Sequence, residues 1–271
     1  MIVLSKSTLI SASVCMLYDV PMGNFYDKVA KKYGGYGFTS NLPQYTSVYP
    51  DANPEKVYKD KLLDLAGRST AALDVGCGDG KFSFEIADRF SSIVGLDSSI
   101  ELINIAQQKK TDLGVGNISF VYGDAQNAPF DAQTFDLIFN RRGPGFYEEY
   151  YRLLKPGGHY LEIGIGEKDA EPLKKIFGRG QNYGGWDNPR LGSDRKKLEG
   201  LGFKIVFMKD YTYTEHYLSR DEFVKFLQGV PIFEDFDFEK DKQYLDKYFS
   251  EYMQGDNVVL SRHRVVYVVQ K

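Results

Sequence analysis

Apolar and polar positions follow two rhythms through the middle of the chain. Short, mostly apolar runs recur at residues 71–75, 93–96, 118–122, 135–139 and 159–165. Between these runs, apolar side chains return at every third or fourth position, as they do on one face of a helix. Helical segments of this kind are residues 81–90, 98–106 and 147–154. Strands and helices that alternate in this way form a parallel sheet with helices on both faces, so the pattern predicts an α/β protein with a doubly wound, mostly parallel sheet.

The flanking segments extend this prediction. Residues 24–66 contain two expected cap helices, separated by a loop rich in Gly and Pro. After the fifth strand, the chain adds strands at residues 203–208 and 262–270, which brings the expected sheet to seven strands. Two helices within residues 215–254 form an insertion before the last strand.

Two details of organisation follow from the same segments. Ser219 and Glu222 predict a capping box at the start of the first inserted helix. We expect a single domain over residues 22–271 and a poorly ordered leader over residues 1–21. The apolar stretch of that leader is too weak for a cleaved signal peptide.

Composition narrows the function classes. The 271 residues carry a net charge of −3 with a pI near 5.7, and their short Lys/Arg clusters are scattered among acids. A protein that neutralises many phosphates usually has a basic face, so this balance disfavours a nucleic-acid partner. Two cysteines and three separated histidines predict neither a disulfide framework nor a metal site. No apolar run approaches the roughly 20 residues of a membrane span. We therefore expect a cytoplasmic protein without such a span.

The segment after the first strand carries the most specific chemistry. Asp74 lies on the strand, and Gly76, Gly78 and Gly80 alternate before a helix begins. Glycines let the backbone turn sharply beside a ligand, and the helix N-terminus presents N–H groups at the same place. The acid would repel a pyrophosphate but suits an ammonium or sulfonium group. The spacing also differs from the G-x-G-x-x-G of dinucleotide-binding domains, which disfavours a nicotinamide-dependent oxidoreductase.

Two further strand ends carry acids. Asp97 closes the second strand about 20 residues beyond the glycines, where an acid can accept both hydroxyls of a ribose. Asp124-Ala125 closes the third strand, where a carboxylate can accept an adenine amine. Places for an amino acid, a ribose and an adenine together describe S-adenosylmethionine. The alternative is that the acids only cap strand ends and the glycines only form a tight turn.

The order of these motifs resembles that of class I S-adenosylmethionine-dependent methyltransferases. Two later segments, Phe135–Ile138 and Leu153–Gly158, resemble the strand and the helix-loop that follow in that family. The resemblance covers Asn24 to Gly166 and the last strand, which it implies to be antiparallel. It is greatest to the branch that contains the ubiquinone and menaquinone biosynthesis methyltransferases.

The resemblance implies S-adenosylmethionine as cofactor and assigns roles to particular residues. Asp74, Gly76 and Gly78 would line the methionine moiety, Asp97 would bind ribose, and Asp124 with Ala125 would border adenine. Tyr26 would lie on an aromatic helix that folds over the cofactor. The other positions expected to border the cofactor are Cys77, Ser98 and Asn140.

The acceptor side is predicted from the rule that ligands of open α/β sheets bind beyond the carboxyl ends of the strands. Asn140, Arg141 and Arg142 follow the fourth strand there. Many methyltransferases of nucleobase or amide nitrogen carry an Asn/Asp-Pro-Pro-aromatic motif at this place, and the chain shares only its Asn. One of the arginines can clamp a carboxylate or phosphate of the substrate. Alternatively, one pairs with a nearby acid and the other is solvated.

Further candidates for the acceptor side are more scattered. Glu167 and His216 are eligible general bases, needed only if the nucleophile arrives protonated. Trp186 lies in a Gly-rich segment that acts either as a lid or as a plain connector. The phenylalanines of the insertion are expected in the core rather than in a substrate pocket; they are Phe223, Phe226, Phe233, Phe236 and Phe238.

These features together predict a methyltransferase that acts on a small molecule by in-line displacement. An RNA or protein methyltransferase is the alternative within the same class. A non-catalytic protein that keeps the fold is the alternative from another class. The intact Gly76, Gly78 and Asp97 favour a working cofactor site, because a degenerate site would lose these residues first.

Overall fold

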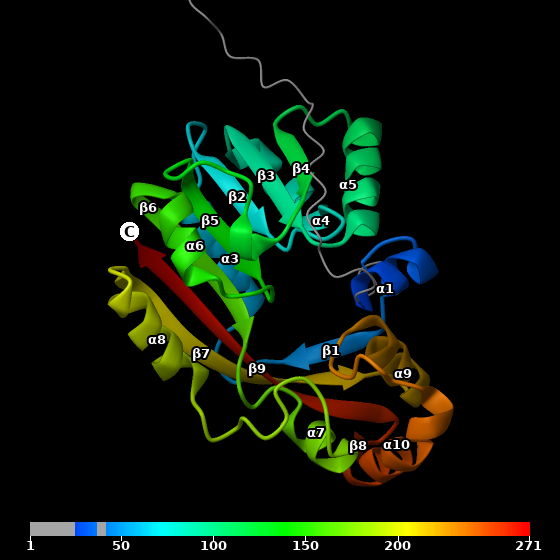
Figure 1. Cartoon of the computed structure of the whole chain (residues 1–271). Coiled ribbons are helices and arrows are strands. Elements are labelled where there is room, and N and C mark those ends of the chain that lie inside the picture. The colour runs from blue at the N-terminus through cyan, green and yellow to red at the C-terminus, as the bar shows by residue number, and fades with distance from the viewer. Residues whose placement is uncertain (1–24, 37–41) are drawn as a thin grey trace, which may run out of the picture.

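The computed structural model describes residues 25–36 and 42–271, and the predicted leader over residues 1–21 lies outside them. Its strands are β1 (Tyr45–Val48), β2 (Ala71–Val75), β3 (Ser92–Asp97), β4 (Ile118–Tyr122), β5 (Phe135–Arg141), β6 (Leu154–Ile165), β7 (Lys204–Tyr217), β8 (Met253–Gln254) and β9 (Asn257–Gln270). Over the described part of the chain they form one nine-stranded sheet in the order β1-β7-β9-β6-β5-β2-β3-β4, with β8 paired to β9 (Figure 1).

The predicted doubly wound sheet is confirmed. Strands β4, β3, β2, β5 and β6 run parallel to one another. The last strand, β9, runs antiparallel to both β6 and β7, as the resemblance implied. The carboxyl ends of the parallel strands therefore meet at one edge, where an open α/β sheet binds its ligand.

Helices cover both faces of the parallel strands. The α-helices of the described residues are α1 (Phe25–Tyr33), α3 (Pro54–Leu65), α4 (Lys81–Ile86), α5 (Ile100–Leu113), α6 (Tyr147–Leu153), α7 (Glu171–Phe177), α8 (Arg190–Gly200), α9 (Arg220–Gly229) and α10 (Phe238–Tyr252). Tyr58 and Leu62 of α3 pack on one face with Leu137 of β5. On the other face, Tyr150 of α6 packs with Ile138, the next residue of β5. Successive strand residues thus bury opposite faces, as pleating requires.

The sheet is larger than the sequence pattern predicted. Strands β7 and β9 each extend well beyond the expected 203–208 and 262–270, and β1 forms in a segment expected to be a loop. In the extra part of β7, buried Tyr213 and Tyr217 alternate with more exposed Thr214 and His216. This period-two pattern is that of a strand, but its tyrosines and polar residues give no apolar run. β1 then pairs with this extension, with Tyr45 opposite Tyr217.

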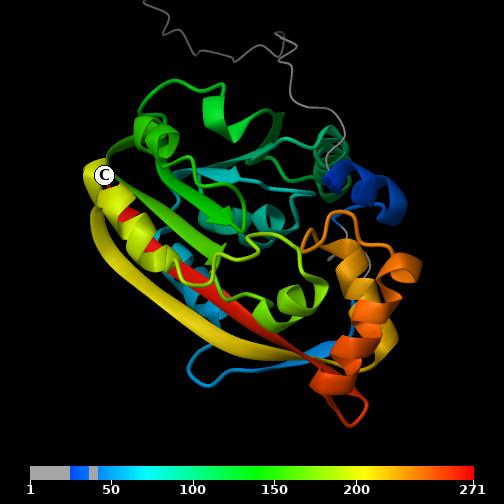
Figure 2. The same ribbon diagram turned by 60° about the horizontal axis from the view of Figure 1, so that its bottom comes forward.

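The long strands carry a second lobe. Figures 1 and 2 show β1, β8, α7, α9 and α10 gathered around the far halves of β7 and β9, below the parallel strands. We refer to this part as the lower lobe and to the part around β2–β6 as the upper lobe. Phe223, Phe226 and Phe233 are buried in the core of the lower lobe, which confirms their expected role. Phe236 is partly buried and packs against this core, whereas Phe238 is 42% exposed, so its expected place in the core is wrong.

The predicted capping box is only half formed. The Ser219 hydroxyl accepts a hydrogen bond from the Glu222 amide at 3.2 Å, so Ser219 caps α9 as expected. The Glu222 carboxylate instead accepts from the Gln44 amide at 2.7 Å. Glu222 thus fastens the chain before β1 to α9, because β1 lies next to the start of this helix. Among the described residues, no helix is long and apolar enough to cross a membrane, and no group of His, Cys, Asp or Glu is arranged to hold a metal ion.

Candidate active site

The glycine-rich turn joins β2 to α4 with three left-handed residues. Gly76, Gly78 and Gly80 have φ of 70°, 56° and 74°, which glycine adopts far more easily than other residues. A Cβ at Gly80 would lie 2.5 Å from the Phe120 ring, whereas a Cβ at Gly78 would meet no atom within 4 Å. Gly80 is therefore required for packing, and Gly78 borders open space in which a ligand can approach the backbone.

Asp97 ties this turn to the end of β3. One of its carboxylate oxygens accepts from the Gly78 amide at 2.7 Å and the other from the Ser99 amide at 2.9 Å. Burial raises the pKa of Asp97, although the amides of Ser99 and Gly78 favour its ionised form. Each oxygen keeps a lone pair for a further donor. The two amides therefore fix a carboxylate that can accept two neighbouring hydroxyls.

Asp74 has a drier environment at the end of β2. Its side chain is 3% exposed, and it accepts a hydrogen bond from the Ser83 hydroxyl at 2.5 Å. Burial raises the pKa of Asp74 to about 7, against the lowering effects of the Ser83 hydrogen bond and the Arg141 charge. A cationic ligand beside this carboxyl would compensate for its lost hydration.

The other residues predicted around the cofactor differ in exposure. Asp124 is exposed and caps a short 3-10 helix by accepting from the Gln126 amide at 2.8 Å, next to buried Ala125. Ser98 is exposed beside Asp97. Cys77 is buried within the glycine turn, and burial raises the pKa of its thiol. The structure thus brings the three predicted strand ends to one edge of the sheet, since β2, β3 and β4 are parallel neighbours.

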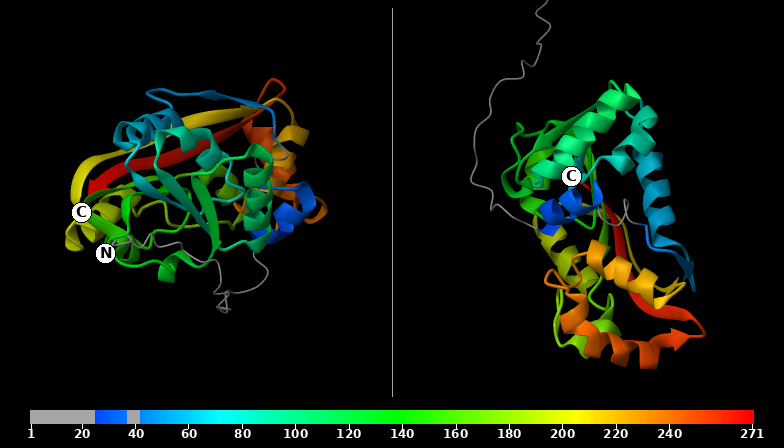
Figure 3. Two further views of the ribbon diagram at one scale, coloured as in Figure 1. Left: turned by 90° about the horizontal axis from the view of Figure 1, so that it is seen from above. Right: turned by 90° about the vertical axis from the view of Figure 1, so that its right-hand side faces the viewer.

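Helix α1 covers this edge beside β3. The Ser99 hydroxyl hydrogen-bonds the Asp27 carboxylate, and Lys31 pairs with Glu101 at 3.4 Å. Figure 3 shows α1 lying between α5 and α9. Burial raises the pKa of Tyr26, and the nearby Tyr36 and Asp97 raise it further. Tyr26 therefore lies close enough to Asp97 to interact with it electrostatically.

Asn140 at the end of β5 is fully buried, and its side chain forms hydrogen bonds within its own loop. Its carboxamide oxygen accepts from the Gly143 amide at 2.7 Å, and its nitrogen donates to the Pro144 carbonyl at 2.6 Å. Both ends of the amide are thus engaged within residues 140–144. Its role in the structure is to set the path of the chain past the glycine turn rather than to offer a free polar group.

Arg141 and Arg142 both pair with Glu55, the second residue of α3. Arg141 lies 3.0 Å from one carboxylate oxygen, and Arg142 contacts the other. Burial opposes ionisation of Glu55, but the charges of Arg142 and Arg141 prevail and lower its pKa to about 2. Neither arginine is simply solvated, in contrast to one of the two alternatives. The sequence gives no sign of Glu55, because 86 residues separate it from Arg141.

The remaining predicted residues have partners elsewhere. Glu167 accepts from the Arg190 amide at 3.2 Å at the start of α8. His216 lies on the more exposed face of β7, 2.9 Å from the Thr214 hydroxyl and opposite Thr46 of β1. It therefore belongs to the lower lobe, on the far half of β7.

Trp186 packs within its own segment. Its ring meets Tyr183 edge-on at a centroid distance of 5.3 Å, and the Lys175 ammonium lies 5.6 Å from the ring. Lys175 belongs to α7, so these contacts hold the ring beside that helix.

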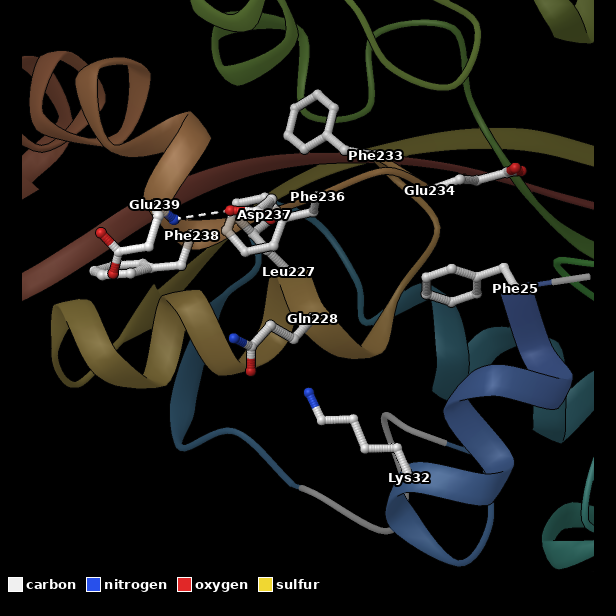
Figure 4. A pocket seen from close by; sticks show the side chains of 10 residues that line it. All are labelled: Phe25, Lys32, Leu227, Gln228, Phe233, Glu234, Phe236, Asp237, Phe238 and Glu239. Carbon is white, nitrogen blue, oxygen red and sulfur yellow. Dashed lines mark hydrogen bonds between the residues drawn. The ribbon is translucent and has the colours of Figure 1, made fainter.

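A pocket of about 310 Å³ opens between α1 and the segment that joins α9 to α10. Figure 4 shows Phe25 and Lys32 of α1 reaching into it, with Gln228 of α9 facing Lys32. The Tyr33 hydroxyl also donates to Gln228 at 3.5 Å, so α1 bridges the two lobes. The sequence pattern did not indicate this pocket, because its walls are about 200 residues apart along the chain.

Comparisons with known proteins agree with this geometry. A methyltransferase-domain family model matches residues 72–158. A demethylmenaquinone methyltransferase of Oceanobacillus iheyensis is 37% identical over 172 residues, which cover 52% of this chain and 72% of that protein. Phosphoethanolamine N-methyltransferase 3 of Arabidopsis thaliana is 29% identical over 62% of this chain, but only 34% of the plant protein is matched.

A solved structure shares the fold. It is a protein of Bacillus halodurans described as a methyltransferase, with a TM-score of 0.59, 19% identity, and coverage of 78% of this chain and 97% of that one. Identity this low supports the architecture alone, whereas the Oceanobacillus relative is 37% identical over 72% of its own length. The chain belongs to the class I S-adenosylmethionine-dependent methyltransferases.

Proposed function

We propose that this protein transfers the methyl group of S-adenosylmethionine to a small-molecule acceptor. The observation that carries the proposal is the Asp97 carboxylate, of which the Gly78 amide holds one oxygen and the Ser99 amide the other. Such a carboxylate suits the two hydroxyls of a ribose. The open space beside Gly78 leaves room for the ligand against the backbone.

In this proposal the three strand ends divide the cofactor among them. Asp74, with Gly76, Cys77 and Gly78, borders the amino-acid end, where a buried carboxyl suits an ammonium group. Asp124 and Ala125 border the adenine, and exposed Asp124 has carboxylate capacity for an amine donor. Ser98 lies beside the ribose, and Tyr26 covers it from α1.

The chain's own residues mainly align and enclose the reactants. When bound, S-adenosylmethionine supplies a methyl group on a sulfonium that is already activated for displacement. The residues at the end of β5 then hold the acceptor in line, and α1 shields the site from water. Neither Glu167 nor His216 is required, because a nucleophile that arrives deprotonated needs no base.

Two observations favour a small acceptor over RNA or protein. The two relatives are named as methyltransferases of demethylmenaquinone and of phosphoethanolamine, both small molecules. The net charge of −3 gives no general basic surface for a nucleic acid. We also propose that residues from α1 onward act as one domain in which α1 and α3 form the cap and residues 215–254 wall the acceptor side. The free thiol of Cys77 fits a reducing, cytoplasmic compartment.

Calorimetric titration with S-adenosylmethionine and S-adenosylhomocysteine tests the cofactor site. We expect micromolar binding that weakens at least about tenfold, or roughly 1.4 kcal/mol, in Asp97→Ala. The matched control is Asp246→Ala, which removes an exposed carboxylate from α10 and leaves the affinity unchanged. Absence of binding by folded wild-type protein would refute the proposal.

A further inference from the structure

Three arginines from two strands gather beyond the carboxyl end of β6. Arg142 follows β5, whose last residue, Arg141, pairs with Ile163 of β6. Ile165, two residues further along β6, pairs with Arg264 on its other side. Arg264 and Arg142 thus lie on either side of the same strand end. Their backbones are about 10 Å apart, which is twice the spacing between neighbouring strands. Arg262 follows on β9, two residues beyond Arg264.

The side chains share one face of the sheet. Val266 and Val268 of β9 pack in the same core as Tyr58 of α3, and residues two apart on a strand point the same way. Arg264 and Arg262 therefore continue the face of β9 that α3 covers. Glu55, in the first turn of α3, pairs with Arg142, so this guanidinium reaches the same face.

The ion pairs of this cluster do not neutralise its positive charge. Arg262 pairs with Asp169 at 3.0 Å and with Glu215 at 3.1 Å, while Arg264 shares Asp169 at 2.5 Å. Arg141 and Arg142 share Glu55 in the same way. Within these ion pairs, four guanidinium groups face three carboxylates, an excess of one positive charge. Arg262 is 7% exposed and Arg264 2%, and buried charges are normally paired.

Unsatisfied donors lie in the same cluster. The buried Nε of Arg264 has no hydrogen-bond partner within residues 25–36 and 42–271. The Nε of neighbouring Arg141 also has none, but its guanidinium lies over the Phe82 ring, 4.2 Å from the ring centroid. The Nε of Arg262 lies 3.0 Å from Asp169 but is not aligned to donate to it. A buried donor left without an acceptor destabilises the fold, so a cluster of such donors indicates an acceptor supplied from outside.

The electrostatic coupling between the two strands agrees with this geometry. Arg264 contributes to the lowered pKa of Glu55, and Arg262 opposes the raised pKa of Arg142. The backbone of Arg142 is left-handed, with φ of 63°, a conformation that persists only where the surroundings hold it. The Arg142 amide does donate to the Ile163 carbonyl at 2.8 Å. The cluster is therefore a fixed arrangement at the acceptor side.

We propose that the methyl acceptor carries an anionic group, a carboxylate or a phosphate, which is bound by Arg142, Arg262 and Arg264. This inference rests on the proposed methyltransferase function and names the substrate class. Planar guanidinium groups bind both anions in bidentate fashion. The anion neutralises the excess charge, accepts from the free N–H groups and holds the other end of the acceptor toward the cofactor edge.

Ligand-detected NMR on the full-length protein saturated with S-adenosylhomocysteine tests the site. The probes are inorganic phosphate and benzoate, which separate a phosphate-bearing acceptor from a carboxylate-bearing one. The variants are Arg142→Gln, Arg264→Gln and the charge-conserving Arg142→Lys. The matched control is Arg195→Gln, which removes an exposed guanidinium from α8.

We expect millimolar binding of at least one probe, weakened at least tenfold in Arg142→Gln and Arg264→Gln, less in Arg142→Lys, and not in Arg195→Gln. If Arg264→Gln fails to fold, Arg142→Gln decides, because its pairing with Glu55 is partly exposed. Normal binding of S-adenosylhomocysteine without binding of either probe overturns the anion site alone. The same holds if Arg195→Gln weakens binding equally. If the folded wild-type protein does not bind S-adenosylhomocysteine, the methyltransferase function itself is refuted.

Discussion

Two carboxyl groups at neighbouring strand ends have different chemistry because their donors differ. Asp97 accepts from two backbone amides, whereas Asp74 accepts from the Ser83 hydroxyl and is otherwise buried. The sequence indicated both acids, because each ends an apolar run beside the glycines. It did not indicate Ser83, which is one polar residue among many in a helix. The position of a carboxyl can thus be predicted locally, but its ionisation depends on which donors the fold brings to it.

Asp74→Asn should stabilise the protein more at pH 8 than at pH 5. The pKa of Asp74 rises from 3.8 to about 7 on folding. The contribution of Asp74 to the free energy of unfolding is therefore fully present below pH 3.8, which is its pKa in the unfolded chain. This contribution is lost as the pH rises through about 7, its pKa in the folded protein. Asn mimics the protonated form and still accepts from Ser83. We expect its gain over wild type to be about 2–3 kcal/mol larger at pH 8 than at pH 5, as measured by urea unfolding.

The same variant should bind S-adenosylmethionine less tightly at pH 8, because a neutral amide cannot compensate an ammonium charge. A stability gain that does not change between the two pH values would contradict the assigned ionisation of Asp74.

At the scale of elements, the sequence predicted the strands that are buried along almost their whole length. It missed strand segments in which buried and exposed residues alternate. β2 and β5 are buried almost throughout, so each appears in the sequence as an apolar run. The added half of β7 buries Tyr213, Glu215 and Tyr217 on one face only. Its buried positions are aromatic or charged, and no apolar run marks them. Side-chain identity alone therefore could not separate this strand from a loop.

Substitutions in the glycine turn should separate packing from ligand binding. Gly78→Ala should cost about 1–2 kcal/mol for its left-handed backbone and lower the affinity for S-adenosylhomocysteine at least tenfold. Gly80→Ala adds a clash with the Phe120 ring, so it should cost about 1–3 kcal/mol more. Urea unfolding and calorimetric titration of both variants measure the two effects. Equal stability losses would show that the contact with Phe120 is not limiting.

At the scale of the molecule, the proposed acceptor side is assembled from distant parts of the chain. Glu55 and Arg141 are 86 residues apart, and Tyr33 and Gln228 are 195 apart. Neither pair has a local signature, so sequence patterns could name Arg141 and Arg142 but not their partner. The register of β9 against β6 and β7 supplies Arg264 and Arg262. This register is a property of the whole sheet.

The two lobes should unfold together, because β7 and β9 run through both. Trp186, the sole tryptophan, lies beside α7 in the lower lobe, so its fluorescence reports that lobe while far-UV circular dichroism reports the whole. Phe223→Ala in the lower core should destabilise the protein by about 3–5 kcal/mol. Both signals should shift to the same lower urea midpoint. A separate dichroism transition at the wild-type midpoint would show that the lobes unfold independently.

Arg264 is paired on both sides, with Ile165 of β6 and Tyr211 of β7. A residue in the middle of a sheet moves less than a loop residue, so the bound anion lies at a fixed distance from the glycine turn. The site then selects acceptors by the distance between their anionic end and the atom that is methylated. Analogues one methylene longer or shorter present the wrong atom, even when their charge is unchanged.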